Sequence, residues 1–205
     1  NSNQPLIGSN RSVLVFNGEI FNWPELYEEL DFSIEKPNSD TQFLCKLLEN
    51  NLIEKYISKF KGFFSFVYYD AKEHSIVFAR DCFGVKPLYF SVINKKYPTF
   101  SSTSEALAMH PYSQLNLDHK SMEIFMRYGF FSHNSSPFKN IDQVNPGQLF
   151  KCVLDDEDIF KNLSIIKNYG INTLPFNSFN GNLNQEFDEN YFDHLLERSC
   201  KLRML

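Results

Sequence analysis

The sequence has few residues that could hold a structural metal ion or a disulfide framework. It contains four cysteines among 205 residues, and they lie far apart at Cys45, Cys82, Cys152 and Cys200. There is no Cys-x-x-Cys pair, and no histidine cluster lies beside any of the cysteines. Because zinc sites and disulfide frameworks depend on regularly spaced thiols, the sequence indicates neither.

Long apolar runs and basic clusters are also missing. The longest apolar run, residues 63–69, is interrupted by Ser65 and is far shorter than the roughly 20 residues that span a bilayer. The first residues, Asn1 to Pro5, do not form a signal peptide. The net charge is −5 and Lys and Arg are scattered, so neither nucleic acid nor a membrane is expected as a partner. We expect a soluble, cytoplasmic protein.

What is abundant is apolar and aromatic. Apolar residues make up 42% of the chain, and the 22 phenylalanines are spread along it, twelve of them within the strands and helices expected below, rather than interleaved with Lys and Arg. Core packing explains this distribution better than base stacking. The length allows one sizeable core plus a remnant, but not two complete domains.

Hydrophobic periodicity and capping residues predict an α+β chain, with a helix pair followed by an antiparallel meander. Asn22 with Pro24 and the capping box Ser39-x-x-Gln42 mark two helix starts. The expected helices are residues 22–30, 39–50, 56–60, 105–110, 118–128 and 188–205, and the expected strands are residues 13–16, 63–69, 75–79, 88–92, 99–102 and 148–154.

The composition changes after residue 154, where acidic residues and then many Asn and Ser follow. We therefore expect three parts: a domain over residues 1–154, a linker over residues 155–187, and residues 188–205 as the first helix of a further domain.

The chain is organised around a strand that ends at Asn17-Gly18-Glu19. The side-chain amide of Asn17 and the backbone N–H of Gly18 are two donors that could meet one developing oxyanion, as acyl transfer requires. Asn-Gly is also the commonest pair in type I′ hairpin turns, and the local sequence alone favours that alternative.

Other polar residues allow structural explanations. From the local sequence, Asp40 is best explained as part of a helix cap, and Glu19 could be a solvated charge at a strand end. For Arg80, Asp81 and Lys86 we favour a turn held by charge and hydrogen bonds over catalysis. Nothing near Cys82 marks that thiol as an activated nucleophile.

Four phrases of the sequence together point to one family. They occur in order at Asn17-Gly18-Glu19-Ile20-Phe21-Asn22, at Ser39-Asp40-Thr41, at Gly62-Phe63-Phe64-Ser65-Phe66, and at Arg80-Asp81-x-x-Gly84-x-Lys86-Pro87-Leu88-Tyr89-Phe90. In this order and spacing the chain resembles the glutaminase domain of asparagine synthetases over about residues 4 to 150. The last helix resembles the start of the ATP-using synthetase domain of that family.

The resemblance implies a class II glutamine amidotransferase domain of the N-terminal-nucleophile hydrolase type, a four-layer α/β/β/α sandwich of antiparallel sheets. It implies that glutamine is hydrolysed here and that ammonia passes to the protein's own C-terminal synthetase domain, a ligase that amidates aspartate in asparagine biosynthesis. ATP and magnesium would bind in that synthetase domain, and no cofactor is expected to bind to the present chain. The resemblance implies that Asn17 and Gly18 form the oxyanion hole and that Glu19 and Asp40 contact glutamine. The Asp40 carboxylate would hold the α-ammonium group of the glutamine.

The family's nucleophile is a cysteine at the mature N-terminus, whereas this sequence begins with Asn1. We expect the nucleophile and a first strand upstream of this sequence, and an ATP-binding loop downstream of it. The sandwich is thus expected to be incomplete at its N-terminus, with unpaired strand edges. On this expectation the full-length protein is an enzyme, while this chain alone is inactive.

Two other functions remain open. The domain could be a non-catalytic scaffold of an ATP-dependent amide-forming ligase, such as a β-lactam synthetase or a lasso-peptide cyclase. It could also act alone as a binding module for glutamine or for a partner protein. A homodimer is compatible with either function. The acceptor that is amidated is not encoded in these residues, so aspartate is the expectation from the family alone.

Overall fold

The computed structural model describes residues 3–30, 35–132, 134–154, 162–170 and 188–204. The strands are β1 Leu6–Ile7, β2 Val13–Ile20, β3 Gly62–Asp70, β4 Ser75–Arg80, β5 Tyr89–Ile93, β6 Tyr97–Ser101, β7 Asp142–Gln143, β8 Gln148–Val153 and β9 Leu163–Asn168. The α-helices are α1 Trp23–Glu28, α2 Asp40–Glu49, α3 Ile53–Tyr56, α4 Ser104–Ala108, α5 His119–Tyr128 and α7 Glu189–Arg203. Short 3-10 turns lie at Ser9–Arg11 and Ile57–Lys59.

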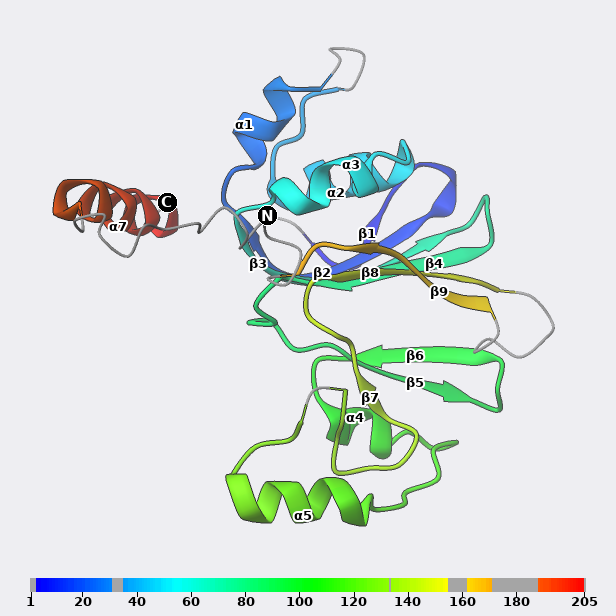
Figure 1. Ribbon diagram of the computed structural model, residues 1–205. Coiled ribbons are helices and arrows are strands. Elements are labelled where there is room, and N and C mark those ends of the chain that lie inside the picture. Colours follow the sequence, from blue (N-terminus) through cyan, green and yellow to red (C-terminus); the bar gives the residue numbers. More distant parts are fainter. Residues whose placement is uncertain (1–2, 31–34, 133, 155–161, 171–187, 205) are drawn as a thin grey trace.

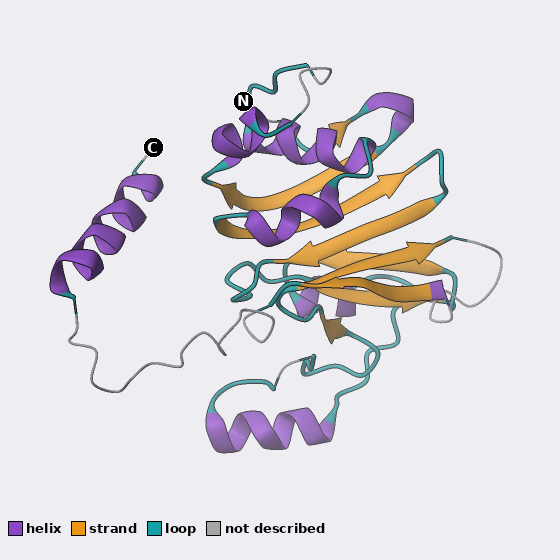
Figure 2. Ribbon diagram, turned by 45° about the horizontal axis from the view of Figure 1, so that its top comes forward, coloured by secondary structure: helices purple, strands orange, loops and turns teal. Residues whose placement is uncertain are grey.

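The strands form two sheets with antiparallel pairing throughout. A six-stranded sheet has the order β1-β2-β3-β4-β8-β9, and a three-stranded sheet has the order β6-β5-β7. Helices α1 to α3 lie on the outer side of the large sheet, and α4 and α5 lie on the outer side of the small sheet (Figure 1). The strands of both sheets are seen together between these helices in Figure 2. The predicted four-layer α/β/β/α sandwich is therefore confirmed.

The two faces of the large sheet differ in how deeply their side chains are buried, as β2 illustrates. Leu14, Phe16 and Ile20 alternate along β2, are buried, and belong to the core cluster that α2 completes with Leu44 and Leu48. Because side chains alternate across a strand, the residues between them face the small sheet. Val15 is 51% exposed on that face. An uninterrupted apolar run such as residues 13–16 is typical of a strand that is buried on both faces, but here only one face is buried.

The contact between the two sheets is mostly aromatic and lies away from β2. Phe78 of β4 is buried at its centre and contacts Phe90 of β5, Phe100 of β6 and Phe150 of β8, with ring centroids 4.9 to 5.9 Å apart. Aromatic pairs at such distances stabilise a core beyond their buried area. The sheets are therefore held together around β4, which leaves the space between β2 and β6 open.

The two predicted helix starts differ in their contacts. Ser39 caps α2, because its hydroxyl accepts a hydrogen bond from the N–H of Gln42 (3.2 Å). Asn22 precedes α1 as predicted, but its side chain makes no capping bond. Its amide instead donates to the carbonyl of Lys59 (3.0 Å) and accepts from the N–H of Lys61 (2.8 Å). Asn22 therefore joins the end of β2 to the segment before β3.

The end of the expected first domain needs a correction. Residues 163–168, which we placed in the linker, form β9 and pair with β8 at the edge of the large sheet. The sequence there is short and half polar, and only pairing with β8 makes it a strand. The rest of the expected linker, residues 155–161 and 171–187, lies outside the described residues.

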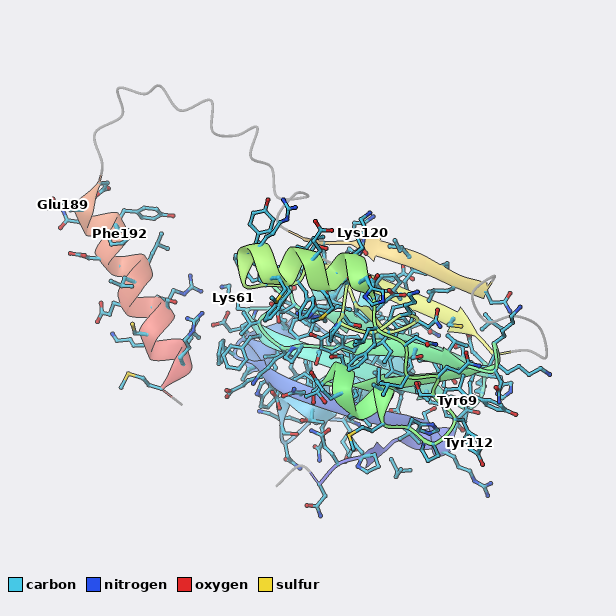
Figure 3. All side chains as sticks on the ribbon, turned by 90° about the horizontal axis from the view of Figure 1, so that it is seen from below. Lys61, Tyr69, Tyr112, Lys120, Glu189 and Phe192 are labelled. Carbon is cyan, nitrogen blue, oxygen red and sulfur yellow. The ribbon has the colours of Figure 1, made fainter. Side chains whose placement is uncertain are left out.

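The last two long helices begin as predicted, and α5 also ends as predicted, whereas α7 ends at Arg203 and not at residue 205. The apolar sides of both helices are open. Gly129 ends α5 in the left-handed conformation (φ 77°), and the Asp188 side chain caps α7. Met126 on α5 and Phe192 on α7 are 80% and 49% exposed. Figure 3 shows α7, with Glu189 and Phe192 labelled, beside the body of the sandwich. Among the helices that the structure describes, none has the length and apolar character to cross a membrane.

Candidate functional site

Asn17 and Gly18 lie within β2 and not in a turn. Asn17 pairs with Ser65 and Gly18 with Phe64 in the register of β2 and β3, and the pairing continues to Ile20 opposite Gly62. A type I′ hairpin at this pair is therefore excluded. The side chain of Asn17 is exposed on the face of β2 that looks toward the small sheet.

Gly18 is required by a close approach of two backbones. Its φ is +134°, a region that side-chain-bearing residues rarely adopt, and a Cβ there would lie 2.1 Å from the carbonyl oxygen of Phe63. No side chain other than hydrogen fits between β2 and β3 at this point. The close packing of the two backbones therefore sets the position of Gly18, the residue next to Asn17.

Asp40 connects the start of α2 to the end of β2. One carboxylate oxygen, Oδ2, accepts a hydrogen bond from the N–H of Ile20 (3.1 Å), and the other, Oδ1, accepts from the N–H of Thr41 (2.7 Å). Ser39 and not Asp40 is the N-cap residue, so capping alone does not account for Asp40. Within the described part of the chain, the Asp40 carboxylate has no Lys or Arg partner, which leaves its charge available to a cation.

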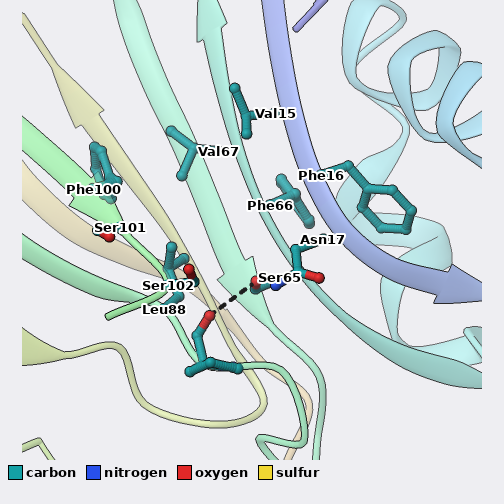
Figure 4. A pocket seen from close by; sticks show the side chains of 11 residues that line it. Val15, Phe16, Asn17, Ser65, Phe66, Val67, Leu88, Phe100, Ser101 and Ser102 are labelled. Atoms are coloured by element: carbon teal, nitrogen blue, oxygen red, sulfur yellow. Dashed lines mark hydrogen bonds between the residues drawn. The ribbon is translucent and has the colours of Figure 1, made fainter. Parts of the chain in front are cut away.

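A hollow of about 540 Å³ lies between the two sheets beside Asn17. Figure 4 shows its lining, in which apolar side chains surround the Asn17 amide and several hydroxyl groups. The lining residues are Val15, Phe16, Asn17, Ser65, Phe66, Val67, Pro87, Leu88, Phe100, Ser101 and Ser102. A few polar groups in an apolar hollow are typical of a site for a small molecule or for an extended segment of chain.

The four residues expected at the site are not equally close together. Asn17, Gly18 and Glu19 are consecutive in β2, and Asp40 is hydrogen-bonded to Ile20 at the end of the same strand. Only Asn17 among them lines the hollow. Glu19 is exposed opposite Phe63, and its carboxylate has no hydrogen bond or ion pair to other described residues. A role for Glu19 in binding therefore stays a prediction.

The loop after β4 forms one wall of this region and is held by two buried charged residues. Arg80 donates to the carbonyls of Lys86, Val144 and Gly84 at 2.7 to 2.8 Å. Asp81 accepts four backbone N–H groups, at 3.0 to 3.2 Å, from Phe64, Phe83, Val85 and Lys86. Burial lowers the pKa of Arg80. These contacts confirm that Arg80 and Asp81 hold a turn, as the sequence favoured.

Two of the cysteines, Cys45 and Cys82, are not activated nucleophiles. Burial and then the Asp81 carboxylate raise the pKa of Cys82, and burial and the Glu49 carboxylate raise the pKa of Cys45 to about 12. A raised pKa keeps a thiol protonated and unreactive. Nor do the described residues include three or more His, Cys, Asp or Glu side chains grouped to hold a metal ion.

This arrangement agrees with what comparison with known proteins shows. A sequence model described as the glutamine amidotransferase domain matches residues 1–162. The chain belongs to the glutamine amidotransferase domain family. The match covers every residue that we placed at the site, and it ends just before β9.

Relatives of this amidotransferase domain carry the name that the sequence motifs indicated. The chain is 32% identical over 164 residues to the Bacillus subtilis (strain 168) protein "Asparagine synthetase [glutamine-hydrolyzing] 1". It is 29% identical over 150 residues to "Putative asparagine synthetase [glutamine-hydrolyzing] 2" of Methanocaldococcus jannaschii. These matches cover 78% and 73% of the chain but only 26% and 29% of the two relatives. The predicted resemblance to asparagine synthetases is confirmed.

Solved structures support the fold. A Bacillus subtilis glutamine phosphoribosylpyrophosphate amidotransferase, complexed with ADP and GMP, matches 82% of the chain and 32% of its own length, with a TM-score of 0.50 and 20% identity. A structure described as the allosteric regulatory enzyme of purine biosynthesis also matches 82% of the chain and 31% of its own length, with a TM-score of 0.51. At 20% identity these matches show the shared fold of amidotransferases alone.

Several lining residues of the hollow were not foreseen. Ser65 stood out only as the interruption of an apolar run and as one residue of a family phrase, and Ser101 and Ser102 only as the end of a strand. The period-2 pattern of β3 places Ser65 on the face opposite Phe64 and Phe66, so the strand pattern carried part of the signal. The sequence pattern did not indicate which residue of β2 lies opposite Ser65, and this was the information needed to place Ser65 beside Asn17.

Proposed function

We propose that this domain is the glutamine-hydrolysing half of an asparagine synthetase-like amidotransferase. In this proposal it releases ammonia from the side-chain amide of glutamine, and a synthetase domain uses the ammonia to amidate aspartate at the expense of ATP. The observation that carries the proposal is the placement of Asn17 in a small-molecule-sized hollow, with the Asp40 carboxylate hydrogen-bonded to the end of the same strand, in a member of the glutamine amidotransferase family.

The chemistry assigns a role to each residue. The Asp40 carboxylate lacks a cationic partner among the described residues and would pair with the α-ammonium group of glutamine. A nucleophile would attack the side-chain carbonyl, whose oxygen gains negative charge as the tetrahedral intermediate forms. The amide of Asn17 and the N–H of Gly18 would donate to that oxygen, which is where fixed donors lower the barrier. Glu19 would contact glutamine from the neighbouring position of β2.

The nucleophile of this proposal is a cysteine that the present sequence does not contain. The hollow has room for this cysteine, because the hollow lies between β2 and the edge strand β6 and extends to the Asn17 amide. Val15, 51% exposed there, would be covered by a chain segment that entered the hollow. Such a segment would bring its reactive group next to the two donors.

For the whole protein we propose the arrangement that the relatives' names suggest. The glutaminase domain would extend through β9, a linker would follow it, and α7 would begin the synthetase domain, where ATP and magnesium bind. The apolar side of α7 that the structure leaves exposed, including Phe192, supports this role, since further chain would cover it. The proposal includes a cytoplasmic location and a homodimer.

The test is glutamine hydrolysis by the full-length protein, measured as glutamate and ammonia released. We expect activity in the natural protein, and Asn17→Ala should lower kcat about 100-fold to 1000-fold, the usual effect of removing one oxyanion donor. Asn168→Ala, which removes an exposed amide paired with Gln148 in β8, is the matched control and should retain activity. A full-length protein that uses ATP but never hydrolyses glutamine would instead support the non-catalytic scaffold.

A further inference from the structure

Gln4 is a polar residue just before β1 for which the proposed function has no role. Strand β1 begins at Leu6, which pairs with Leu14 of β2. Continued by two residues, this register would set Gln4 opposite Phe16. The Gln4 side chain makes both bonds of that position, because its Nε2 donates to the Phe16 carbonyl oxygen (2.6 Å) and its Oε1 accepts from the Phe16 N–H (2.8 Å). A side-chain amide has the donor and the acceptor of a peptide group, so it extends β1 by one further pair.

Gly18 belongs to the same edge of β2, the outer edge that faces away from β3. In an antiparallel ladder, successive residues direct their N–H and C=O groups to opposite sides, so alternate residues share an edge. The N–H of Phe16 points to the outer edge, and so does the N–H of Ile20, which donates to Asp40 (3.1 Å). Gly18 lies midway between these two residues and is therefore expected to face outward with them.

The partner of Gly18 in β3 indicates the same direction. Phe64 lies opposite Gly18, but its N–H donates to Asp81 Oδ2 (3.2 Å) and its carbonyl oxygen accepts from the Asp81 N–H (2.7 Å). Both backbone groups of Phe64 thus point away from β2, as in a non-hydrogen-bonded pair. The N–H of Gly18 is therefore presented on the outer edge, between the residue that Gln4 holds and the residue that Asp40 holds.

Gly18 depends on restraints from outside its own strand. Pairing with β3 holds β2 from the inner side only, through Asn17 and Glu19 on either side of Gly18. Gly18 has no side chain that could restrain its backbone, and its φ is +134°. A donor that meets a developing negative charge needs a fixed direction, because a displacement of about 1 Å can lower a rate about 100-fold. Contacts at the outer edge on both sides of Gly18 supply this restraint.

We propose that Gln4 is a positioning residue that fixes the outer edge of β2 before Gly18, as Asp40 fixes it after Gly18, and so sets the direction of the Gly18 N–H. Gln4 is itself exposed, so packing does not account for its place, and both ends of its amide are used on Phe16. The inference rests on the proposed function for its kinetic consequence. In this role Gln4 acts through the Phe16 backbone and does not touch the substrate.

The kinetic test is glutamine hydrolysis by variants of the full-length protein. The kcat is expressed per site that a diazoketone analogue of glutamine labels, so that unfolded protein does not count. Gln4→Met keeps the length of the side chain but neither bond, and it should lower kcat about 10-fold while KM changes less than about twofold. Gln4→Glu keeps the acceptor but sets a carboxylate oxygen against the Phe16 carbonyl, so it should lower kcat at least as much.

Gln148→Met is the matched control for Gln4→Met. The Gln148 amide donates to Asn168 (2.9 Å) in the strand pair at the other edge of the large sheet, and its loss should leave kcat unchanged. An unchanged kcat in Gln4→Met, or an equal loss in Gln148→Met, would overturn the inference.

Hydrogen–deuterium exchange of the full-length protein, resolved at single residues, gives an answer independent of activity. In Gln4→Met the amide of Phe16 should exchange about 10-fold faster, because its acceptor is gone. The amide of Leu14, which pairs with β1, should exchange at the same rate as in the natural protein. Unchanged exchange at Phe16 contradicts the inference even if no glutaminase activity is found, and faster exchange confined to Phe16 supports the part of it that concerns β2.

Discussion

The N–H of Ile20 donates a hydrogen bond to Oδ2 of Asp40 over 3.1 Å, and this bond joins the end of β2 to the first turn of α2. Residues from two elements that are separate in the chain thereby meet at one point. The carboxylate that we assign to the glutamine α-ammonium is set at a fixed place relative to Asn17, which lies earlier in the same strand. In the function that we propose, substrate orientation and oxyanion stabilisation would therefore both depend on this end of β2.

Removing the charge of Asp40 should weaken glutamine binding. A hydrogen bond to a charged group contributes about 1.5–3 kcal/mol, so Asp40→Asn should raise the KM for glutamine about 10-fold to 100-fold. The measurement is steady-state hydrolysis by the full-length protein. Asp118→Asn is the control, because Asp118 also accepts backbone and side-chain hydrogen bonds at a helix start, that of α5. An unchanged KM in Asp40→Asn would remove Asp40 from the site.

A methyl group at Gly18 should separate β2 from β3. Gly18→Ala places a Cβ 2.1 Å from the Phe63 carbonyl oxygen at a φ of +134°, and both the contact and the conformation are unfavourable. We expect a loss of about 2–5 kcal/mol in the free energy of unfolding. Urea unfolding of the full-length protein, followed by a signal from this domain, measures it.

Gly129→Ala provides the control for that substitution. Gly129 also has a positive φ, but nothing lies within 4 Å of the added Cβ. Only the cost of the left-handed conformation remains, about 1–2 kcal/mol. If the two alanine variants lose the same stability, the close approach of the two strands at Gly18 is not what requires glycine.

Asp81 should matter for stability more than its place in a loop suggests. Each of its oxygens accepts two backbone N–H groups, so Asp81→Asn sets an NH₂ group against two donors. We expect about 2–4 kcal/mol of destabilisation from the unsatisfied buried groups. Asp70→Asn is the comparison, because the Asp70 Oδ1 accepts the N–H groups of Lys72 and Glu73 in an exposed turn and an amide oxygen can replace it. Similar losses in both variants would contradict the assigned role of Asp81.

Cys45 should make the domain sensitive to alkaline pH. Its pKa is raised to about 12 from a usual value of 9.0, so the folded state favours the neutral thiol. The stability from this group is complete below pH 9 and is lost as the pH rises toward 12. Between neutral pH and about pH 10.5, unfolding in the presence of a reductant should show a smaller stability loss for Cys45→Ala than for the natural protein. Cys200→Ala, at an exposed thiol, should lose as much stability as the natural protein.

Much of the architecture was encoded locally and could be predicted. Period-2 and helical patterns identified β3, β4 and α2, and the Ser39 to Gln42 phrase located the start of α2, because these patterns describe contacts between residues that are near in sequence. The motifs taken together also indicated the amidotransferase family. The residue types of the candidate site, an amide, a glycine and a carboxylate, were visible for the same reason.

The tertiary structure decided what depends on residues far apart in the chain. Asn17-Gly18 is a turn pair by its own sequence and a strand segment only because β3 pairs with it. Residues 163–168 become a strand only beside β8. The sequence by itself therefore determined which chemical groups are present and in which local elements. Strand register, which brings Ser65 opposite Asn17, decided how those groups face one another, because cross-strand neighbours have no fixed separation in sequence.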